Sequence, residues 1–177
     1  MLDLTQSYFA LFDLPVRFEV DDQNVAQRYR ALQKQLHPDR HAAGNPQEQR
    51  LAVQYSAFVN EAYETLRNPL RRAIYMLAQQ GYDRDVLSSR QVDGGFLIQQ
   101  MDLREKLESV SGLVDPEPVL DHILTEIGAD SAQLMSQLAS GLAAEDYEIS
   151  ATAVLKLQYL DKLRAEAEQM ESWLLEG

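Results

Sequence analysis

Apolar side chains at helical spacing, stopped by a proline, constrain this chain more than any other feature. After Asp21, apolar residues recur at intervals of four, three and four, at Val25, Tyr29, Leu32 and Leu36. That spacing lines one side of a helix. Proline cannot continue the helix, because it has no amide hydrogen and restricts the residue before it. The sequence therefore predicts an amphipathic helix that starts near Asp21 and ends before Pro38.

Similar periodicity along the rest of the chain predicts an all-α protein. A first unit should contain a helical hairpin plus short flanking helices, the last of which Gly81 ends, over about 7–14, 21–37, 47–66 and 70–80. Three longer helices should follow and form a three-helix bundle, over about 95–111, 116–142 and 146–175. We therefore expect an N-terminal domain over 1–81, a linker over 82–95 and a C-terminal domain over 96–177.

Composition excludes several classes of site. The 177 residues are 45% hydrophobic and 25% charged, which is a globular composition. The absence of cysteine excludes disulfides, a cysteine nucleophile and thiolate ligation of a metal or an iron–sulfur cluster. The N-terminal segment has an early acid and no basic region, and no apolar run reaches the length of a membrane span. We therefore expect a cytoplasmic protein with no membrane partner.

The net charge of −12 is distributed unevenly. Residues 1–80 hold nine Lys/Arg and nine Asp/Glu, a difference of zero, whereas residues 81–177 hold seven and nineteen, a difference of −12. An acidic protein repels phosphate, so nucleic acid is not expected as a partner. The asymmetry indicates two units with different electrostatic tasks.

One side of the first amphipathic helix is basic and leads to the tripeptide His37-Pro38-Asp39. At about 100° per residue, the positions away from the apolar stripe are Gln27, Arg30 and Lys34, and Arg40 follows the tripeptide. Between Gln23 and Gln47 the only acid is Asp39. A basic helix face seen alone is as often merely solvated. Beside this tripeptide, we interpret it as a binding surface.

The helix expected over 95–111 has two apolar faces. On a helical wheel one face holds Phe96, Leu103, Leu107 and Val110. The nearly opposite face holds Leu97, Ile98 and Met101. Glu105 lies among these three residues and Asp102 lies at their edge. Only one face can enter a bundle core, and an apolar centre with a charged rim is typical of a protein-binding patch. The alternative is that both faces are buried, between neighbouring helices or in a dimer.

These features resemble a known family over nearly the whole chain. Tyr8 to Pro15, Tyr29 to Leu32, Leu36 to Arg40, and Asn60 to Leu66 through Pro69, Arg72 and Tyr75 together resemble a J-domain, the co-chaperone module that drives ATP hydrolysis in a DnaK-type chaperone. Phe96 to Glu105 and Leu157 to Arg164 resemble the C-terminal bundle of the HscB family, co-chaperones of iron–sulfur cluster biogenesis.

This resemblance implies two protein partners and no cofactor. We also expect no enzymatic activity of the chain itself, because no group is arranged to attack phosphate and no glycine-rich phosphate loop is present. The J-domain of HscB docks on HscA, a DnaK-like ATPase, and the bundle carries IscU, the scaffold on which the cluster is built. By resemblance, the residues that stimulate or contact the ATPase are His37, Pro38, Asp39, Arg30, Lys34 and Arg40. Those that bind the scaffold are Leu97, Ile98, Met101, Asp102, Glu105 and Tyr159.

Three other interpretations were weighed. A metal site from His37, His41 and His122 is disfavoured because these histidines lack ligand spacing. A catalytic pair among Glu105, Glu108, Asp161 and Glu166 is disfavoured because acidic helix faces are common. A J-domain co-chaperone for a different or general client stays open, although neither a Gly/Phe-rich linker nor a cysteine-rich module follows residue 81.

Overall fold

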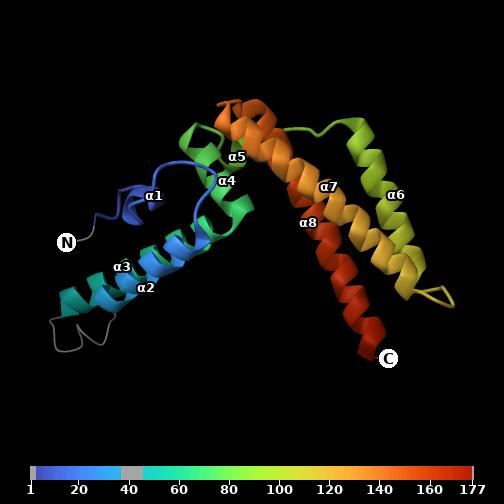
Figure 1. Cartoon of the computed structure of the whole chain (residues 1–177), viewed down its shortest axis with the longest axis horizontal. Coiled ribbons are helices and arrows are strands. Elements are labelled where there is room, and N and C mark those ends of the chain that lie inside the picture. Colours follow the sequence, from blue (N-terminus) through green and yellow to red (C-terminus); the bar gives the residue numbers. More distant parts are fainter. Residues whose placement is uncertain (1–2, 37–45, 177) are drawn as a thin grey trace. The chain divides into compact units, whose positions relative to one another are not determined.

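The computed structural model of the protein describes residues 3–36 and 46–176. Within these ranges the chain forms helices and no strands, which confirms the predicted all-α fold (Figure 1). It divides into two compact units between Met76 and Leu77. The predicted site residues His37, Pro38, Asp39 and Arg40 lie outside the described residues.

The first unit is built on a hairpin of α2 (Asp22–Leu36) and α3 (Pro46–Arg67), which lie side by side (Figure 1). Asp21 caps α2, because its side chain accepts hydrogen bonds from the amides of Gln23 and Asn24 at 3.0 and 3.3 Å. Across the hairpin Tyr29 stacks on Tyr63, with ring centroids 4.0 Å apart. The predicted helix start and the predicted hairpin are both confirmed.

The core of the first unit lies where α1 (Tyr8–Leu11) packs against this hairpin. Its fully or largely buried members are Phe9, Leu11, Phe12, Val25, Val59, Ala62 and Leu66. Tyr8 joins α1 to α4 (Pro69–Gln79): its ring stacks on Tyr75 at 4.4 Å, and its amide donates to the Tyr75 hydroxyl at 3.0 Å. The short flanking helices are thereby fixed to the hairpin.

A buried cation ties the end of α3 to the segment before α2. Arg72 is only 5% exposed; its Nη1 donates to the carbonyl of Leu66, and its guanidinium lies 5.1 Å from the Phe18 ring centroid. The last carbonyls of a helix have no partner within the helix, so an arginine at this position satisfies one of them. Burial lowers the pKa of Arg72.

The second unit contains the predicted three-helix bundle. It consists of α6 (Gly94–Val110), α7 (Glu117–Ala143) and α8 (Tyr147–Glu176), with α7 and α8 packed along each other and α6 against both (Figure 1). The buried side chains of α6 are Phe96, Leu103, Leu107 and Val110. The core face expected from the helical wheel is therefore confirmed.

The segment between α4 and α6 is more ordered than its sequence indicates. Gly81 ends α4 at φ +87°, as predicted. The following residues, interpreted as an irregular linker, include the short helix α5 (Arg84–Ser88). Asp83 caps it by accepting from the amides of Asp85 and Val86, both at 3.0 Å. Five residues are too few for periodicity to reveal such a helix.

The turn between α7 and α8 depends on one buried glycine. A Cβ atom at Gly141 would lie 2.6 Å from Ser150 Oγ and 3.2 Å from the carbonyl oxygen of Asp146. Ser150 is itself fully buried and donates its hydroxyl to that same carbonyl at 2.8 Å. The absence of a side chain at Gly141 therefore lets the first turn of α8 approach the end of α7.

Candidate partner-binding surfaces

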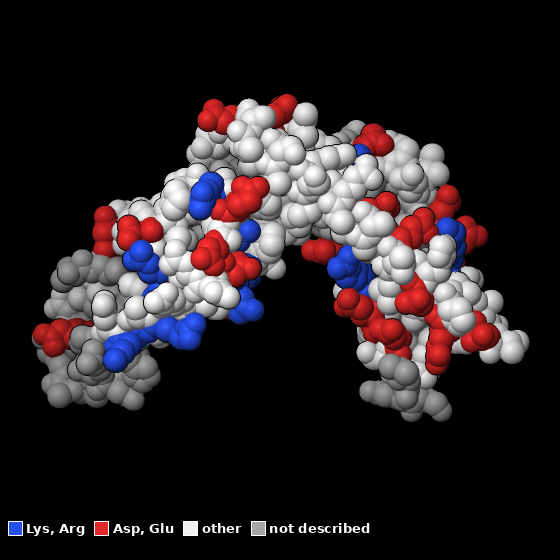
Figure 2. Space-filling model, in the orientation of Figure 1, with Lys and Arg blue, Asp and Glu red and all other residues white. Residues whose placement is uncertain are grey.

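The basic side of α2 is exposed, as the sequence predicts. Arg30 and Lys34 are both exposed, and Arg30 Nε donates to the carbonyl of Ala26 at 3.1 Å. A shallow hollow beside them is lined by Asp22, Gln23, Ala26, Gln27 and Arg30. In Figure 2, basic side chains gather along the lower edge of the first unit, whereas acidic ones are spread over the second. On the face shown, the first unit thus has a basic edge and the second unit carries more acidic than basic side chains.

The position of this basic face is set by polar contacts between the two hairpin helices. The Tyr29 hydroxyl donates to Asn60 Oδ1 at 3.0 Å, and Gln33 donates to both of these groups. The neighbouring Arg28 forms an ion pair with Asp13 at 2.9 Å. Sequence periodicity places Arg28 next to the basic face but gives no sign of this pairing.

An apolar strip on α6 faces solvent. The exposed fractions are 37% for Leu97, 62% for Ile98 and 70% for Met101, and Tyr159 on α8 is 46% exposed. Asp102 and Glu105 are also exposed. In the single chain the alternative of two buried α6 faces is therefore wrong. We call this surface, formed by Leu97, Ile98, Met101, Asp102, Glu105 and Tyr159, the α6 patch.

Tyr159 belongs to the α6 patch because its ring meets α6 directly. The rings of Phe96 and Tyr159 are in edge-to-face contact, with centroids 6.2 Å apart and planes at 74°. Phe96 is buried below the strip, so this contact joins the core face of α6 to the exposed edge of α8. Sequence periodicity alone cannot relate residues so far apart; only the resemblance had grouped them.

Ion pairs join α6 to both neighbouring helices. At its N-terminus Asp93 accepts from the Phe96 amide at 2.9 Å and pairs with Lys156 of α8 at 2.5 Å. Further along, Arg104 pairs with Glu166 of α8 at 2.7 Å, and on the other side Lys106 pairs with Glu126 of α7 at 3.6 Å. The hydrogen bond from Lys156, followed by that from the Phe96 amide, lowers the pKa of Asp93.

The segment before α6 is also attached to the start of α8. Arg90 forms an ion pair with Glu148, and the Tyr82 hydroxyl donates to the same carboxylate at 2.7 Å. These two hydrogen bonds, that from Arg90 foremost, lower the pKa of Glu148. None of these contacts is visible in the sequence pattern, because the partners lie 58 and 66 residues apart.

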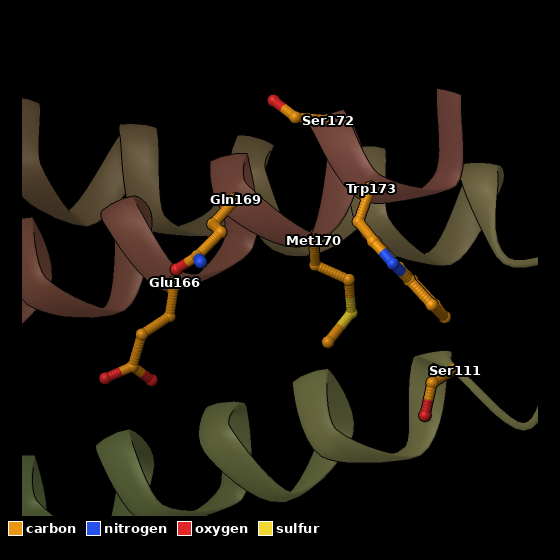
Figure 3. A pocket seen from close by; sticks show the side chains of 6 residues that line it. All are labelled: Ser111, Glu166, Gln169, Met170, Ser172 and Trp173. Atoms are coloured by element: carbon orange, nitrogen blue, oxygen red, sulfur yellow. The ribbon is translucent and has the colours of Figure 1, made fainter. Parts of the chain in front are cut away.

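A separate cavity of about 500 Å³ lies between the C-terminal ends of α6 and α8. It is lined by Ser111, Glu166, Gln169, Met170, Ser172 and Trp173. In Figure 3, Met170 and Trp173 extend from α8 toward α6, and Ser111 stands at the end of α6. Among the described residues of this lining Glu166 is the one acid, and it is paired with Arg104.

The described part of the chain contains neither a group of His, Cys, Asp or Glu that could hold a metal ion nor a helix long and apolar enough to cross a membrane. Among the carboxylates weighed as a catalytic pair, Glu166 forms the ion pair with Arg104, 2.7 Å away. The features that matter for partner binding are the basic side of α2 and the α6 patch.

Comparison with known proteins identifies the family. Residues 8–75 match the DnaJ domain family, and residues 92–168 match the HSCB C-terminal oligomerisation domain family. The chain is 40% identical to a co-chaperone protein HscB homolog of Vibrio cholerae serotype O1 over 169 residues, which cover 96% of this chain and 99% of that relative. This chain belongs to the HscB co-chaperone family.

Other HscB proteins have similar sequences and the same fold. An HscB homolog from Aeromonas salmonicida is 44% identical over 171 residues, 97% of this chain and 99% of the relative. The structure of chaperone HscB from Vibrio cholerae is 40% identical in sequence and superposes with a TM-score of 0.87. The match covers 96% of this chain and 99% of the Vibrio chain. The structure of human co-chaperone HscB, at 27% identity, gives a TM-score of 0.88, and the match covers 96% of this chain and 84% of the human one.

Membership of the HscB family fixes the class of protein. The chain is a J-domain co-chaperone, and a J-domain co-chaperone acts with an Hsp70-type ATPase. HscB proteins are co-chaperones rather than a family of enzymes. Assembly of iron–sulfur clusters is the process that the HscB name implies.

Proposed function

We propose that this cytoplasmic co-chaperone stimulates ATP hydrolysis by a DnaK-like chaperone of the HscA type and delivers to it an iron–sulfur scaffold of the IscU type. In this proposal residues 1–81 are the J-domain, residues 82–95 are a linker and residues 96–177 bind the scaffold. The observation that carries the proposal is the α6 patch, an exposed apolar strip with a carboxylate rim on a helix whose opposite face is buried. Membership of the HscB family supports it.

The J-domain would act by binding, since the sequence of residues 1–81 contains no glycine-rich phosphate loop. Arg30, Lys34 and Arg40 would attract an acidic surface of the ATPase, and His37, Pro38 and Asp39 would contact the state that hydrolyses ATP. A partner shifts an equilibrium only by its differential affinity for the two states. Exposed charges are screened over about 8 Å at physiological salt, so stimulation should fall as salt rises.

An ATPase assay tests the J-domain. We expect Asp39→Asn to abolish stimulation of an HscA-type ATPase while the far-UV circular dichroism of the chain is unchanged. The double variant Arg30→Gln/Lys34→Gln should reduce stimulation and flatten its salt dependence. Its control, Arg67→Gln/Arg71→Gln, removes the same charge from exposed positions of α3 and α4. This control should leave both the stimulation and its salt dependence unchanged. Full stimulation by Asp39→Asn would refute the assignment.

The α6 patch would hold the scaffold by burying its apolar strip, with Asp102 and Glu105 facing cations of the partner. An apolar side chain removed from water at an interface contributes about 1–3 kcal/mol. Leu97, Ile98 and Met101 together could therefore change affinity by at least about a hundredfold. Because all three are exposed in the free chain, their loss should cost the bundle little stability.

Calorimetric titration with an IscU-type scaffold tests this patch. We expect Leu97→Ala/Ile98→Ala/Met101→Ala to weaken binding and to leave thermal unfolding nearly unchanged. A matched control, Val114→Ala/Val119→Ala/Ile149→Ala, truncates three exposed apolar residues of the second unit outside the patch and should bind normally. Unchanged affinity of the first triple variant would count against scaffold binding by α6.

A co-precipitation experiment separates this function from service to other clients. Bait carrying the intact patch should retain a DnaK-like ATPase and a small cysteine-bearing scaffold from cell extract, and the α6 triple variant should retain only the ATPase. Recovery of a broad set of unfolded proteins by both baits would instead favour a general co-chaperone.

A further inference from the structure

The start of α6 is joined to α8 by a lysine that is largely buried. The Lys156 side chain is 20% exposed, pairs with Asp93 at 2.5 Å and places its ammonium group 5.1 Å from the centroid of the Phe96 ring. A cation over an aromatic face is attracted by the ring, and the attraction grows as water is excluded. Lys156 therefore contacts both the cap of α6 and the first core residue of that helix.

Phe96 also contacts a residue at the surface. Its ring meets Tyr159 edge to face, and Tyr159, which belongs to the α6 patch, is 46% exposed. Leu97 follows Phe96 directly in the chain, and its amide donates to the carbonyl of Asp93 at 3.2 Å. Phe96 thus lies between the Lys156 ammonium group and the exposed ring of Tyr159, at the start of the strip.

The other ion pairs of α6 lie further from this junction. Arg104 and Glu166 join the middle of α6 to α8, and Lys106 and Glu126 join the other side of α6 to α7. The Lys106–Glu126 distance is 3.6 Å, and both side chains are at least 40% exposed. Asp93 combines a helix cap with an ion pair to the neighbouring helix, so one carboxylate fixes both where α6 begins and where it lies on α8.

We propose that Asp93 and Lys156 are positioning residues of the α6 patch: they hold Phe96 against Tyr159 and so fix the first turn of α6 in the conformation that binds the partner. This inference rests on the proposed scaffold binding. A pre-arranged surface binds more tightly, because ordering it is no longer part of the cost of association. Neither residue needs to touch the scaffold.

Calorimetric titration of the full chain with an IscU-type scaffold tests this role. Lys156→Met keeps an apolar stem of similar length and removes the charge, and we expect it to weaken affinity by about three- to thirtyfold. Lys156→Arg keeps a cation over the ring and should restore most of the affinity. Lys106→Met, which breaks the pair with Glu126 on the other side of α6, is the matched control and should bind normally.

A double-mutant cycle separates positioning from a loss of stability. In a Tyr159→Ala background the ring that Lys156 helps to place is gone, so Lys156→Met should have little further effect on affinity. A lysine with only a structural role would weaken binding equally in both backgrounds. Should Lys156→Met fail to fold, Asp93→Ser carries the test, because serine still caps the helix but cannot form the ion pair.

The outcomes distinguish this inference from the proposed function. Loss of affinity that arginine restores and that disappears without Tyr159 supports it. If the α6 triple variant binds weakly while Lys156→Met and Asp93→Ser bind like the original chain, the positioning role is overturned and scaffold binding stands. If the unaltered chain binds no scaffold, both are overturned.

Discussion

Two glycines of α7 offer a direct test of how closely α7 and α8 pack. A Cβ at Gly141 would meet Ser150 Oγ at 2.6 Å and the Asp146 carbonyl at 3.2 Å, whereas a Cβ at Gly128 would meet no atom within 4 Å. Both residues are within the same helix. The same substitution to alanine should therefore stabilise the second unit at Gly128 and should not stabilise it at Gly141.

The magnitudes follow from two opposing contributions. Alanine in place of glycine within a helix stabilises it by about 1 kcal/mol, and this contribution is common to both variants. Forcing an extra methyl group into a packed site costs about 1–3 kcal/mol, and only Gly141→Ala meets that cost. Gly128→Ala should thus stabilise the unit by about 1 kcal/mol, and the two variants should differ by about 1–3 kcal/mol.

Urea unfolding followed by tryptophan fluorescence measures this difference. The chain has one tryptophan, Trp173, and it lies in α8, so its signal reports on the second unit rather than on both. With a denaturant slope of about 1–3 kcal/mol per molar urea, the midpoints of the two variants should differ by about 1 M. Unfolding of the whole chain need not be two-state, which is why a signal confined to one unit is required.

Ser150 supplies the decisive control. In Gly141→Ala/Ser150→Ala the hydroxyl oxygen at 2.6 Å is removed, so part of the lost stability should return. The proposed close approach of α7 and α8 would be refuted if Gly141→Ala were as stable as Gly128→Ala, or if removing the Ser150 hydroxyl made the Gly141→Ala variant still less stable.

Three further predictions concern single contacts. Arg72→Met should destabilise the first unit by about 1–3 kcal/mol in thermal unfolding, because the Leu66 carbonyl loses its buried donor; an unchanged midpoint would contradict this. Asp21→Ala should cost about 1 kcal/mol through loss of the α2 cap, and Asp21→Ser should recover most of it. Arg90→Gln should raise the pKa of Glu148 in an NMR titration. The folded state lowers that pKa, so the stability that this carboxylate contributes is present above its unfolded pKa of about 4.3 and is lost as pH falls through the lower folded value. If the pKa of Glu148 were the same in Arg90→Gln as in the original chain, groups other than Arg90 would be responsible for lowering it.

The helices and their faces could be predicted because they are local. Spacing of apolar residues and an aspartate before α2 indicated where helices lie, and Gly81 indicated where α4 ends, since backbone hydrogen bonds in a helix join residues four apart. The same periodicity separated the buried face of α6 from Leu97, Ile98 and Met101. It missed α5, which is shorter than two turns and has no room for a repeat.

The contacts between helices could not be predicted in this way. Asp93 and Lys156, Tyr82 and Glu148, and the close approach at Gly141 each join residues from different segments, and their distances depend on how whole helices pack. The sequence by itself determined that α6 has two apolar faces and which residues lie on each of them. Only the tertiary structure decided that Phe96 lies between Lys156 and Tyr159, because a helical repeat records neighbours along one helix and carries no information on which side chain of a second helix stands opposite.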